Sequence, residues 1–479
     1  MKILHVCSEF FPLLKTGGLA DVMGALPMTQ RKLGHDARIL IPGFPDILHN
    51  VKNKQEIACI QSFVGPCKLY ACTYRETHLF IIDCPSLYNR PGSPYHDKEH
   101  VPYHDNHLRF ALLGYIACEI AKDCYPYWKP DIIHAHDWHA GLTCAYLAAN
   151  QYPAKCVFTV HNIAYQGLFA PYHLKELWLP QEFYSSEGLE FYGQISFLKA
   201  GLYYANTSTT VSPTYAREIL HPKFSCGLDL LLKKLKEEKR LCGILNRVDE
   251  TVWSPKYDEF IAQSYSWDEL NKKNVNKVDL QKKLGLSIQN QWPLFTVISR
   301  MTYQKGLDLI IKILPRLAHF GLQCVVVGHG DKPIEKAFED VAHSFPDQIK
   351  VIIGYNEPIS HRVIAGGDVL IIPSRYEPCG LTQLYGLKYG TLPLVRKTGG
   401  LADTVVDCSS ETLANQKATG FVFNECTPFD LLKTVHRALL LWKIKEQWHQ
   451  VQQEAMQQDL GWRKTAKKYD NLYASLLNH

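Results

Sequence analysis

Short apolar runs alternate with stretches of helical periodicity along most of the chain. Residues 3–6 and 132–134 have the composition of buried strands, and residues 108–122 carry the apolar spacing of a helix. Such alternation is typical of parallel sheets covered by helices. The other strands predicted in the first half are residues 37–41, 79–83, 157–160, 207–211 and 241–245, and the other helices are residues 22–33, 141–150 and 196–205.

A polar, lysine-rich and turn-rich segment, residues 248–290, interrupts this alternation. We place the domain boundary at its start, which gives domains of residues 1–245 and 246–460. Each is predicted to be a Rossmann-like, doubly wound α/β domain, and the two are expected to face each other across a deep cleft at the carboxyl ends of their strands. The strands predicted in the second half are residues 294–299, 324–327, 351–353, 369–372, 394–395 and 420–423, and two final helices are residues 443–458 and 462–477.

Length, composition and charge narrow the class of protein. A chain of 479 residues exceeds what one hydrophobic core usually supports, and 46% hydrophobic with 21% charged residues is ordinary for a globular protein. Lys and Arg outnumber Asp and Glu by only 52 to 47, without the basic stripe of a nucleic-acid binder. A few cations gathered around a phosphorylated small molecule fit this balance.

The cysteines and the lack of long apolar runs bear on the cellular compartment in which we expect the protein. Fifteen cysteines are scattered without C-x-x-C spacing, which argues against a zinc knuckle or a disulfide framework and favours reduced thiols. The chain runs from Met1 directly into an apolar strand, and no apolar run reaches the length of a membrane span. We therefore expect a cytoplasmic protein that does not enter a membrane.

One heptapeptide occurs twice. Residues 15–21, KTGGLAD, recur letter for letter as residues 397–403, each between a predicted strand and a predicted helix. Paired glycines at such a turn let backbone N–H groups approach a ligand, and the start of the following helix favours an anion. The sequence predicts one anion-binding turn in each half, with a ligand held between the halves; two ordinary tight turns are the alternative.

Histidines gather after the strand at residues 132–134. The segment 134–139, HAHDWH, offers three imidazoles together with Asp137 and Trp138. A metal site is one interpretation, but this spacing at a strand end splays the rings. A sugar site fits better, because Trp138 offers a flat apolar face and Asp137 offers a hydroxyl partner. A second histidine group, within residues 96–107, is interrupted by proline and is predicted to be a loop.

Two further polar groups follow strand ends. His161 and Asn162 come directly after residues 157–160, where an imidazole and an amide would meet sugar hydroxyls; a structural histidine is the alternative. Arg300 and Lys305 lie where a strand closes and a helix opens, so both cations can converge on one pyrophosphate. Two unrelated surface cations are the alternative.

A third group lies at residues 373–383, PSRYEPCGLTQ. It places Glu377 on a turn, before a helix start whose N–H groups and Thr382 hydroxyl are suited to phosphate oxygens. Tyr355 follows another strand, and its ring is suited to stack on a nucleobase. A dinucleotide cofactor is not favoured, because Pro333 stands where the G-x-G-x-x-G fingerprint requires glycine.

Together these motifs resemble the bacterial and plastid glycogen/starch synthases, a family of retaining glucosyltransferases with the GT-B fold. The resemblance spans nearly the whole chain. The matching segments are KTGGLADV (15–22), DIIHAHDWHAGL (131–142), TVHNIAYQG (159–167), SFLKAGLYYA (196–205), TVSPTYAREI (210–219), DETVWSP (249–255), SRMTYQKG (299–306), PSRYEPCGLTQLYGLKYG (373–390) and KTGGLADTV (397–405).

The resemblance implies transfer of glucose from a nucleoside diphosphate glucose, most often ADP-glucose, to the non-reducing end of an α-1,4-glucan, with no cofactor and no metal. It also implies that residues 461–479 form a helix crossing back onto the first domain. The site residues that it implies are Glu377, His161, Arg300, Lys305 and Asp137 for catalysis; Lys15, Gly17, Gly18, Asn162, Asn246, Gly354, Tyr355, Cys379, Gly380, Leu381 and Thr382 for the donor; and Tyr95, Trp138 and Asp21 for the acceptor.

Two positions bear on how far the resemblance extends. The family usually has Asn-Gly-Ile-Asp where this chain has Asn-Arg-Val-Asp at residues 246–249, so Arg247 replaces a small residue beside a predicted sugar contact. More distant glycosyltransferases have a second glutamate at the second position. This chain has Tyr385 there, as is usual for the family that it resembles. The alternatives are a related enzyme that uses UDP-glucose or another acceptor, and a catalytically silent glucan-binding protein.

Overall fold

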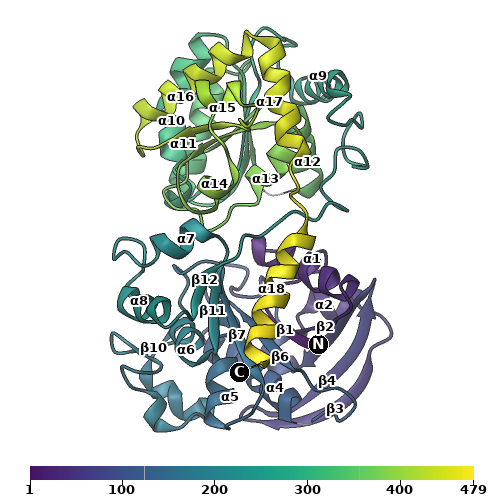
Figure 1. Ribbon diagram of the computed structural model, residues 1–479, viewed down its shortest axis with the longest axis vertical. Helices are drawn as coiled ribbons and strands as arrows, with labels where there is room; N and C mark the ends of the chain where they lie inside the picture. The colour runs from purple at the N-terminus through teal and green to yellow at the C-terminus, as the bar shows by residue number, and fades with distance from the viewer. Residues whose placement is uncertain (123, 355, 479) are drawn as a thin grey trace. The chain divides into compact units, whose positions relative to one another are not determined.

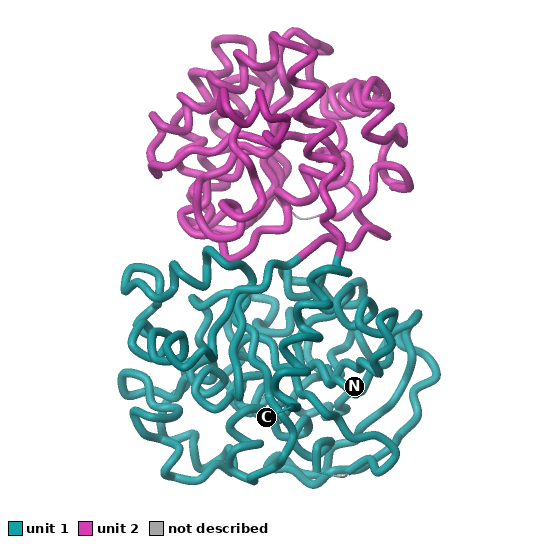
Figure 2. Tube along the Cα trace, in the orientation of Figure 1, with its two compact units in different colours: residues 1–246, 462–479 teal, residues 247–461 magenta. Residues whose placement is uncertain are grey.

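The computed structural model describes residues 1–122, 124–354 and 356–478. The chain divides into two compact units: unit 1 consists of Met1–Asn246 and Trp462–His479, and unit 2 of Arg247–Gly461 (Figure 2). In sequence, unit 2 is therefore inserted before the last helix of unit 1. The chain passes between the units twice.

Unit 1 is built on a nine-stranded sheet (Figure 1). Seven neighbouring strands are parallel, and the sequence order reverses between β1 and β6, as in a Rossmann-like sheet. Every strand predicted for this half is present. In spatial order the strands are β12 (Leu241–Gly243), β11 (Thr207–Thr210), β7 (Lys155–Val160), β6 (Ile132–His136), β1 (Lys2–Val6), β2 (Asp36–Pro42), β5 (Thr77–Asp83), β4 (Gly65–Tyr74) and β3 (Gln55–Ser62).

Helices and a small second sheet complete unit 1, and they include all the helices predicted for this half. The α-helices are α1 (Gly18–Lys32), α2 (Pro45–Asn50), α3 (Pro85–Tyr88), α4 (Asn106–Lys122), α5 (Leu142–Ala149), α6 (Phe197–Tyr204), α7 (Pro213–Glu218), α8 (Asp229–Glu237) and α18 (Trp462–Leu477). The 3-10 helices are η1 (Trp138–Ala140), η2 (Pro171–Leu177) and η3 (Gln181–Phe183), and the small sheet has strands β8 (Leu168–Phe169), β9 (Glu190–Phe191) and β10 (Gln194–Ser196).

The helix α18 is part of the core of unit 1. It packs against α1, as Figure 1 shows, and it buries Trp462, Ala466, Tyr469 and Tyr473 in the same apolar cluster as the strands of the sheet. The hydroxyl of Thr465 donates a hydrogen bond to the carbonyl oxygen of Leu245 (3.0 Å). The helix α18 therefore completes the core around the sheet that contains β1.

Unit 2 is built on a six-stranded, fully parallel sheet. Its order places β13, the first strand of the unit, beside β16, so the sequence order reverses between these two strands. In such sheets ligands bind at the carboxyl ends of the strands, beside this point. In spatial order the strands are β15 (Ile349–Ile353), β14 (Cys324–Gly328), β13 (Phe295–Ile298), β16 (Val369–Ile372), β17 (Leu392–Arg396) and β18 (Phe421–Phe423).

Helices connect the successive strands of unit 2, and others precede its first strand or follow its last one. They are η4 (Leu270–Lys272), α9 (Lys273–Leu284), η5 (Tyr303–Lys305), α10 (Leu307–His319), α11 (Lys332–Ser344), α12 (Glu357–Gly366), α13 (Thr382–Lys388), α14 (Gly399–Thr404), α15 (Ser410–Ala414), α16 (Pro428–Trp442) and α17 (Lys445–Gln457). Together the two sheets confirm the predicted α/β class with two Rossmann-like domains.

The helix α9 corrects the expectation of a turn-rich segment after residue 248. Two of its lysines are buried, because the rest of unit 2 supplies acceptors for them. The ammonium of Lys273 donates to the carbonyl oxygen of Ala365 (2.6 Å) and the hydroxyl of Thr391 (2.8 Å), and Lys277 forms an ion pair with Asp368 (2.8 Å). The lysine content of this segment is typical of an exposed surface. The structure shows that it belongs to a packed helix.

Two observations concern the compartment. None of the fifteen cysteines, all of which lie in the described part of the chain, forms a disulfide. Among the described residues no helix has the length and apolar character required to cross a membrane.

Candidate functional site

The first heptapeptide begins α1, and a carboxylate of the chain itself binds its backbone. Glu9, in the loop after β1, is buried and accepts hydrogen bonds from the N–H groups of Thr16 (2.7 Å) and Gly17 (3.0 Å). The hydroxyl of Tyr95 donates to the same carboxylate (2.5 Å). The predicted anion-friendly turn is therefore real, but its two N–H groups hold Glu9, at a helix terminus that favours negative charge.

Lys15 and Asp21 lie at the two ends of this heptapeptide and form an ion pair (2.9 Å). Between them, Gly17 is partly exposed and Gly18 is exposed. No atom lies within 4 Å of the position that a Cβ would take at Gly17. The turn therefore has open space beside the ion pair of Lys15 and Asp21.

Asp137, predicted to be catalytic, holds the backbone of a neighbouring turn. Its Oδ1 accepts hydrogen bonds from the N–H groups of His161 (2.7 Å) and Asn162 (3.3 Å). Its own backbone has φ 57° and ψ −178°, a region that residues other than glycine rarely occupy. Burial raises the pKa of Asp137 to about 7, although the two backbone N–H groups lower it. The strained aspartate thus ties the carboxyl end of β6 to that of β7.

His161 and Asn162 therefore stand where the sequence places them, at the carboxyl end of β7. His161 is half-buried, and its Nε2 lies 3.1 Å from Nδ1 of His136. Burial lowers the pKa of His161 to about 3, so the ring is neutral at physiological pH. A neutral imidazole offers a sugar hydroxyl one donor or one acceptor but no charge.

Aromatic rings gather beside this turn. The ring of Tyr95 stacks on His139, with 4.6 Å between centroids, and lies 6.5 Å from the ring of Trp138. Gly167 has φ +60°, and a Cβ there would lie 2.3 Å from the Trp138 ring. Glycine at this position therefore lets the indole lie against the backbone. Tyr95 and Trp138, both predicted to bind the acceptor, belong to one aromatic cluster.

The histidines of residues 134–139 separate into two groups. His139 stacks on Tyr95, whereas His134 and His136 lie inside the sheet beside His5. All six ring nitrogens of His5, His134 and His136 are in hydrogen-bonding distance of protein groups. A metal ion at these three rings would have to displace hydrogen bonds that the protein already makes.

A second cluster joins His107, His173 and Glu176. Both imidazoles approach one carboxylate oxygen of Glu176, at 2.9 Å and 2.6 Å. This shared acceptor explains the approach of the two rings, whose centroids are 3.6 Å apart. Nδ1 of His107 is buried without a hydrogen-bond partner, so it lacks the outer acceptor that usually orients a metal-bound imidazole.

In unit 2, Lys305 and Glu377 meet where the strand order reverses. The ammonium of Lys305, at the end of η5, donates to Oε2 of the buried Glu377 (2.7 Å), and the hydroxyl of Ser374 donates to the same oxygen (2.8 Å). Gly306 has φ +65°, and a Cβ there would lie 2.1 Å from the carbonyl oxygen of Pro373. Glycine therefore allows the loops after β13 and β16 to touch.

Arg375 fixes these two loops to each other. Its guanidinium forms a bidentate ion pair with Asp308 (2.7 and 2.9 Å) and donates to the carbonyl oxygen of Tyr303 (2.8 Å). It also lies over the Tyr303 ring, 3.7 Å from the centroid. The hydrogen bonds from Arg375 lower the pKa of Asp308. Arg375 thus binds the segment of Lys305 on both sides of that residue, at Tyr303 and at Asp308.

The second heptapeptide lies behind the Glu377 loop and differs from the first. Gly399 has φ +44°, and a Cβ there would lie 1.8 Å from the carbonyl oxygen of Glu377. A Cβ at Gly400 would lie 2.0 Å from the carbonyl oxygen of Cys379, and both glycines are buried. The second copy therefore differs from the predicted anion-binding turn, because its glycines are buried and allow close packing behind the loop.

The other residues predicted in unit 2 follow the ends of its strands. Arg300 is exposed just after β13. Gly354 follows β15 with φ +127° and has no atom within 4 Å of its Cβ position, while Tyr355 lies outside the described residues. Asn246, at the end of unit 1, is buried, and its N–H donates to the carbonyl oxygen of Val211 (3.4 Å).

The loop after Glu377 leads into α13. Cys379 is buried, and Gly380 has φ +70° with a Cβ position only 2.3 Å from the side chain of Gln383. Leu381 precedes the helix, and Thr382 is its first residue. Four predicted donor contacts, including Gly380 itself, therefore lie on a backbone whose course depends on this glycine.

Sequence reasoning missed Glu9, Ser374 and Arg375. Glu9 lies three residues beyond a predicted strand, so the rule that polar groups after strands form sites would have found it. Ser374 and Arg375 belong to a motif that was recognised, but the partner of Arg375, Asp308, is 67 residues away in sequence. Only the fold shows that contact.

Two family models match the chain. One, described as a starch synthase catalytic domain, matches residues 2–234, and the other, glycosyl transferases group 1, matches residues 282–455. The catalytic domain of Starch Synthase IV from Arabidopsis thaliana, solved bound to ADP and acarbose, has a TM-score of 0.91 and 30% identity, covering 100% of this chain and 99% of that one. A sucrose-phosphate synthase from Thermosynechococcus elongatus, with a TM-score of 0.60 and 15% identity, shares the fold. Fold and family models together define a glycosyltransferase with the GT-B fold.

Full-length relatives narrow the class. The glycogen synthase of Serratia proteamaculans is 55% identical over 476 residues, covering 99% of this chain and 100% of the relative. That of Edwardsiella ictaluri is 55% identical over 477 residues and is covered completely, as is this chain. The chain belongs to the glycogen synthase family. This confirms the resemblance found in the sequence, and the activity is that of a glycosyltransferase of glycogen synthesis.

Proposed function

We propose that the chain transfers glucose from ADP-glucose to the non-reducing end of an α-1,4-glucan with retention of configuration. The observation that carries this proposal is the ion pair of Lys305 and Glu377. It places an ammonium and a carboxylate beside the point where the strand order of unit 2 reverses. The choice of adenine as the nucleobase of the donor is supported by the Arabidopsis starch synthase, which was solved with ADP. Acarbose in that structure supports a glucan-like acceptor. Fifteen cysteines without a disulfide are in keeping with the proposed cytoplasmic location.

The donor pyrophosphate would bind Lys305 and Arg300. An ammonium has three N–H groups, and the bond to Glu377 uses one of them. Arg300 is exposed on the loop that leads to Lys305, where its guanidinium would meet a phosphate from solvent. Leu381 and Thr382, at the start of α13, would add backbone and hydroxyl donors, and Tyr355 would stack on the base.

Sugar and acceptor contacts are proposed for the loops around these cations and for unit 1. Glu377, Cys379 and Gly380 of unit 2 would surround the transferred glucose. In unit 1, we propose His161, Asn162 and Asn246 as sugar contacts. The glucan would lie against Tyr95 and Trp138, and Lys15 and Asp21 would act beside the open Gly17-Gly18 turn. Because Asp137 binds the backbone of residues 161–162, we assign it a positioning role.

The reaction would follow from where charge develops. Breaking the C1–O bond of glucose leaves positive charge on the sugar ring and added negative charge on the diphosphate, which Lys305 and Arg300 stabilise. Retention requires the acceptor hydroxyl to attack from the face that the diphosphate leaves. In that arrangement the departing phosphate oxygen accepts the proton of the attacking hydroxyl, and the new C1–O bond keeps the α configuration.

The deciding experiment is transfer of labelled glucose into glycogen from ADP-glucose and, separately, from UDP-glucose. We expect incorporation mainly from ADP-glucose and its loss in Glu377→Ala. A clear preference for UDP-glucose would overturn the donor assignment. Unchanged incorporation in Glu377→Ala would overturn the role of the carboxylate, with glycogen binding measured in parallel to show that the variant is folded.

A further inference from the structure

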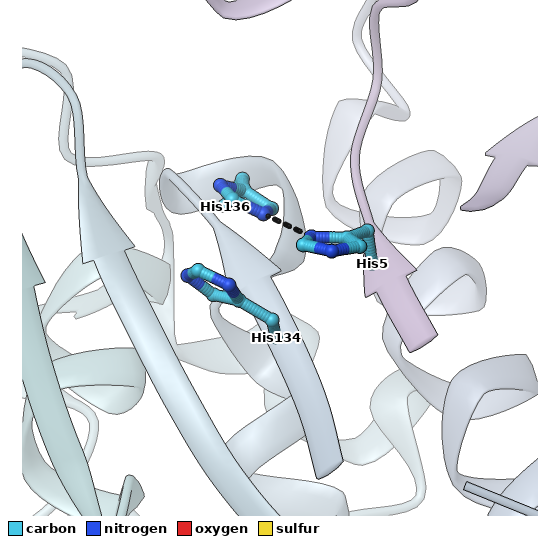
Figure 3. A group of neighbouring side chains, drawn as sticks. All are labelled: His5, His134 and His136. Atoms are coloured by element: carbon cyan, nitrogen blue, oxygen red, sulfur yellow. Dashed lines mark hydrogen bonds between the residues drawn. The ribbon is translucent and has the colours of Figure 1, made fainter. Parts of the chain in front are cut away.

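Three buried imidazoles meet where β1 and β6 lie side by side in unit 1 (Figure 3). His5 of β1 stands opposite His134 of β6, and His136, two residues further along, faces the same side of the sheet as His134. The ring centroids of His134 and His136 are 4.1 Å apart, and those of His5 and His136 are 5.4 Å apart. Because water does not reach these rings, their hydrogen bonds must be made within the protein.

Each of these rings is neutral. Burial lowers the pKa of His5 to about 4, and it lowers the pKa of His134 and of His136 well below the ordinary value. A neutral imidazole has one N–H donor and one acceptor nitrogen. In a chain of such rings, the direction of the first hydrogen bond therefore fixes the direction of every other.

Gln30 of α1 sets that direction for a chain that ends at His161. Its carbonyl oxygen Oε1 accepts from Nε2 of His5 (2.7 Å), which leaves Nδ1 of His5 as an acceptor. His136 then donates from Nε2 to that nitrogen (3.0 Å), and its Nδ1 accepts from Nε2 of His161 (3.1 Å). The proton of His161 is therefore on Nε2, and its Nδ1 can only accept.

The amide nitrogen of Gln30 sets the direction of a second chain. It donates to the hydroxyl of Tyr473 on α18 (3.3 Å), and that hydroxyl donates to Nδ1 of His134 (2.7 Å). Nε2 of His134 then donates to Oγ1 of Thr159 (2.6 Å). If the amide were turned over, both chains would have to reverse, so one side chain orients two branches.

From this geometry we propose that Gln30 is a positioning residue for glucosyl transfer. Through His5 and His136 it keeps the proton of His161 on Nε2, so that Nδ1 of His161 accepts a hydrogen bond from a hydroxyl of the transferred sugar. The inference rests on the proposed role of His161 beside that sugar. Gln30 is separated from His161 by two imidazoles, so it acts on the direction of the hydrogen bonds and does not touch substrate.

The kinetic test compares Gln30→Met with Tyr473→Phe. Methionine keeps the length of the side chain and removes both amide groups, whereas Tyr473→Phe removes only the branch that leads to His134. We expect kcat to fall roughly fivefold in Gln30→Met, the effect of one misdirected hydrogen bond, with KM for glycogen unchanged. In Tyr473→Phe kcat should stay close to that of the wild type. Equal losses in the two variants would overturn the proposal.

A double-mutant cycle with His161→Ala separates this inference from the function on which it rests. If Gln30 acts through His161, Gln30→Met has no further effect on kcat in the His161→Ala background. The same fold-loss in both backgrounds would overturn the role of Gln30 and leave that of His161 intact. Normal turnover in His161→Ala alone would instead overturn the proposed role of His161.

The protonation state can be observed directly on the wild-type protein. Side-chain ¹⁵N spectra of histidine-labelled enzyme distinguish a protonated ring nitrogen from a bare one, and the His161 signals are those missing in His161→Ala. We expect a proton on Nε2 of His161 across the neutral pH range. A proton on Nδ1 would overturn the proposed direction, whether or not Gln30→Met folds.

Discussion

Lys305 and Arg300 lie on one short loop after β13, and Lys305 has the buried carboxylate of Glu377 beside it. Glu377 holds the ammonium in place before a donor arrives, which reduces the ordering that binding would otherwise require. The exposed Arg300 is proposed to bind the same pyrophosphate. The two cations should therefore act together on the leaving group.

We expect Lys305→Ala and Arg300→Ala each to lower kcat by a factor on the order of 100 to 1,000, the usual effect of removing a donor that stabilises developing charge. Initial rates of glucose transfer from ADP-glucose measure this. The matched control is Lys332→Ala, which removes an exposed lysine paired with Glu335 in the same unit. If both loop variants turned over as fast as this control, the pyrophosphate role would be wrong.

The two copies of the heptapeptide allow a comparison of glycines within one molecule. At Gly399 an alanine would combine a positive φ with a Cβ 1.8 Å from a carbonyl oxygen, whereas Gly17 has extended backbone, φ −158°, and open space. Gly399→Ala should cost at least about 2 kcal/mol of folding free energy. Gly17→Ala should leave the free energy of unfolding nearly unchanged.

Thermal unfolding of the two alanine variants tests this difference. Similar melting temperatures would mean that the loop behind Glu377 yields easily and that Gly399 is not required for packing. Because Gly17 faces open space, any loss of activity in Gly17→Ala without a loss of stability would point to a ligand at that turn.

At the scale of elements, α12 is anchored by a buried ion pair and a stack of rings. Nδ1 of His361 lies 2.7 Å from Oδ2 of Asp258, to which the hydroxyl of Tyr389 also donates (2.6 Å). The indole of Trp253 is sandwiched between His361 and Tyr385, at 3.7 Å and 3.9 Å. Position 385 is thus occupied by a ring that packs against the segment entering unit 2.

This pair predicts a pH dependence of stability. Burial alone would lower the pKa of His361, but the hydrogen bonds to Asp258 and Glu357 and the negative charges of both carboxylates together raise the pKa above 6.5. Burial alone would raise the pKa of Asp258, but its bonds to His361 and Tyr389 lower the pKa below 3.8. The histidine therefore stabilises the fold fully below pH 6.5 and loses this effect as pH rises through its raised pKa. The aspartate stabilises the fold above pH 3.8 and loses its effect as pH falls through its lowered pKa.

Asp258→Asn isolates the charge, because asparagine keeps an acceptor for the same partners. The melting temperature of the wild type should exceed that of Asp258→Asn most at about pH 6, and the difference should shrink towards pH 8 and beyond. A difference that stayed constant over this range would show that His361 is not protonated in the folded protein.

The pattern of apolar runs predicted nearly every parallel strand, because a strand covered on both faces must be apolar throughout. It missed the hairpin of β3 and β4, whose residues alternate between exposed and buried positions at the sheet edge. It also missed α9. The ammonium of its buried Lys273 donates hydrogen bonds to acceptors on residues about 90 to 120 positions away. Elements fixed by their own composition were therefore predictable, and elements fixed by distant partners were not.

The site shows the same division. The positions of His161, Lys305 and Glu377 after strands are predictable from the sequence, and the structure joins Lys305 to Glu377 across 72 residues. The sequence could not show that Asp137 would hold the backbone of His161. That contact depends on the close approach of β6 and β7 and on a strained backbone, neither of which a local pattern records.

At the scale of the whole molecule, unit 1 depends on a helix that is 215 residues away from the rest of it in sequence, since unit 2 occupies Arg247–Gly461. The helix α18 buries Tyr469 and Tyr473, and each such ring contributes on the order of 2 kcal/mol by apolar burial. Losing this helix should therefore destabilise unit 1 much more than unit 2.

Tyr469→Ala, with its exposed neighbour Lys468→Ala as the control, tests this dependence. Hydrogen exchange should show faster exchange in peptides of α1 and the unit 1 sheet in Tyr469→Ala, and little change in peptides of the unit 2 sheet. Equal acceleration in both sheets would contradict it, because it would mean that the two units unfold as one cooperative body.

The position of α18 also determines the order in which the molecule can be completed on the ribosome. Unit 2 has all of its residues once Gly461 has been synthesised, whereas unit 1, although begun first, still lacks Trp462 and the rings that follow. Until α18 has been synthesised, the surface of α1 that α18 covers is open to chaperones and to other nascent chains. Of the two units, the one begun first is therefore completed second, and the Gln30–Tyr473 hydrogen bond can form only after Tyr473 has left the ribosome.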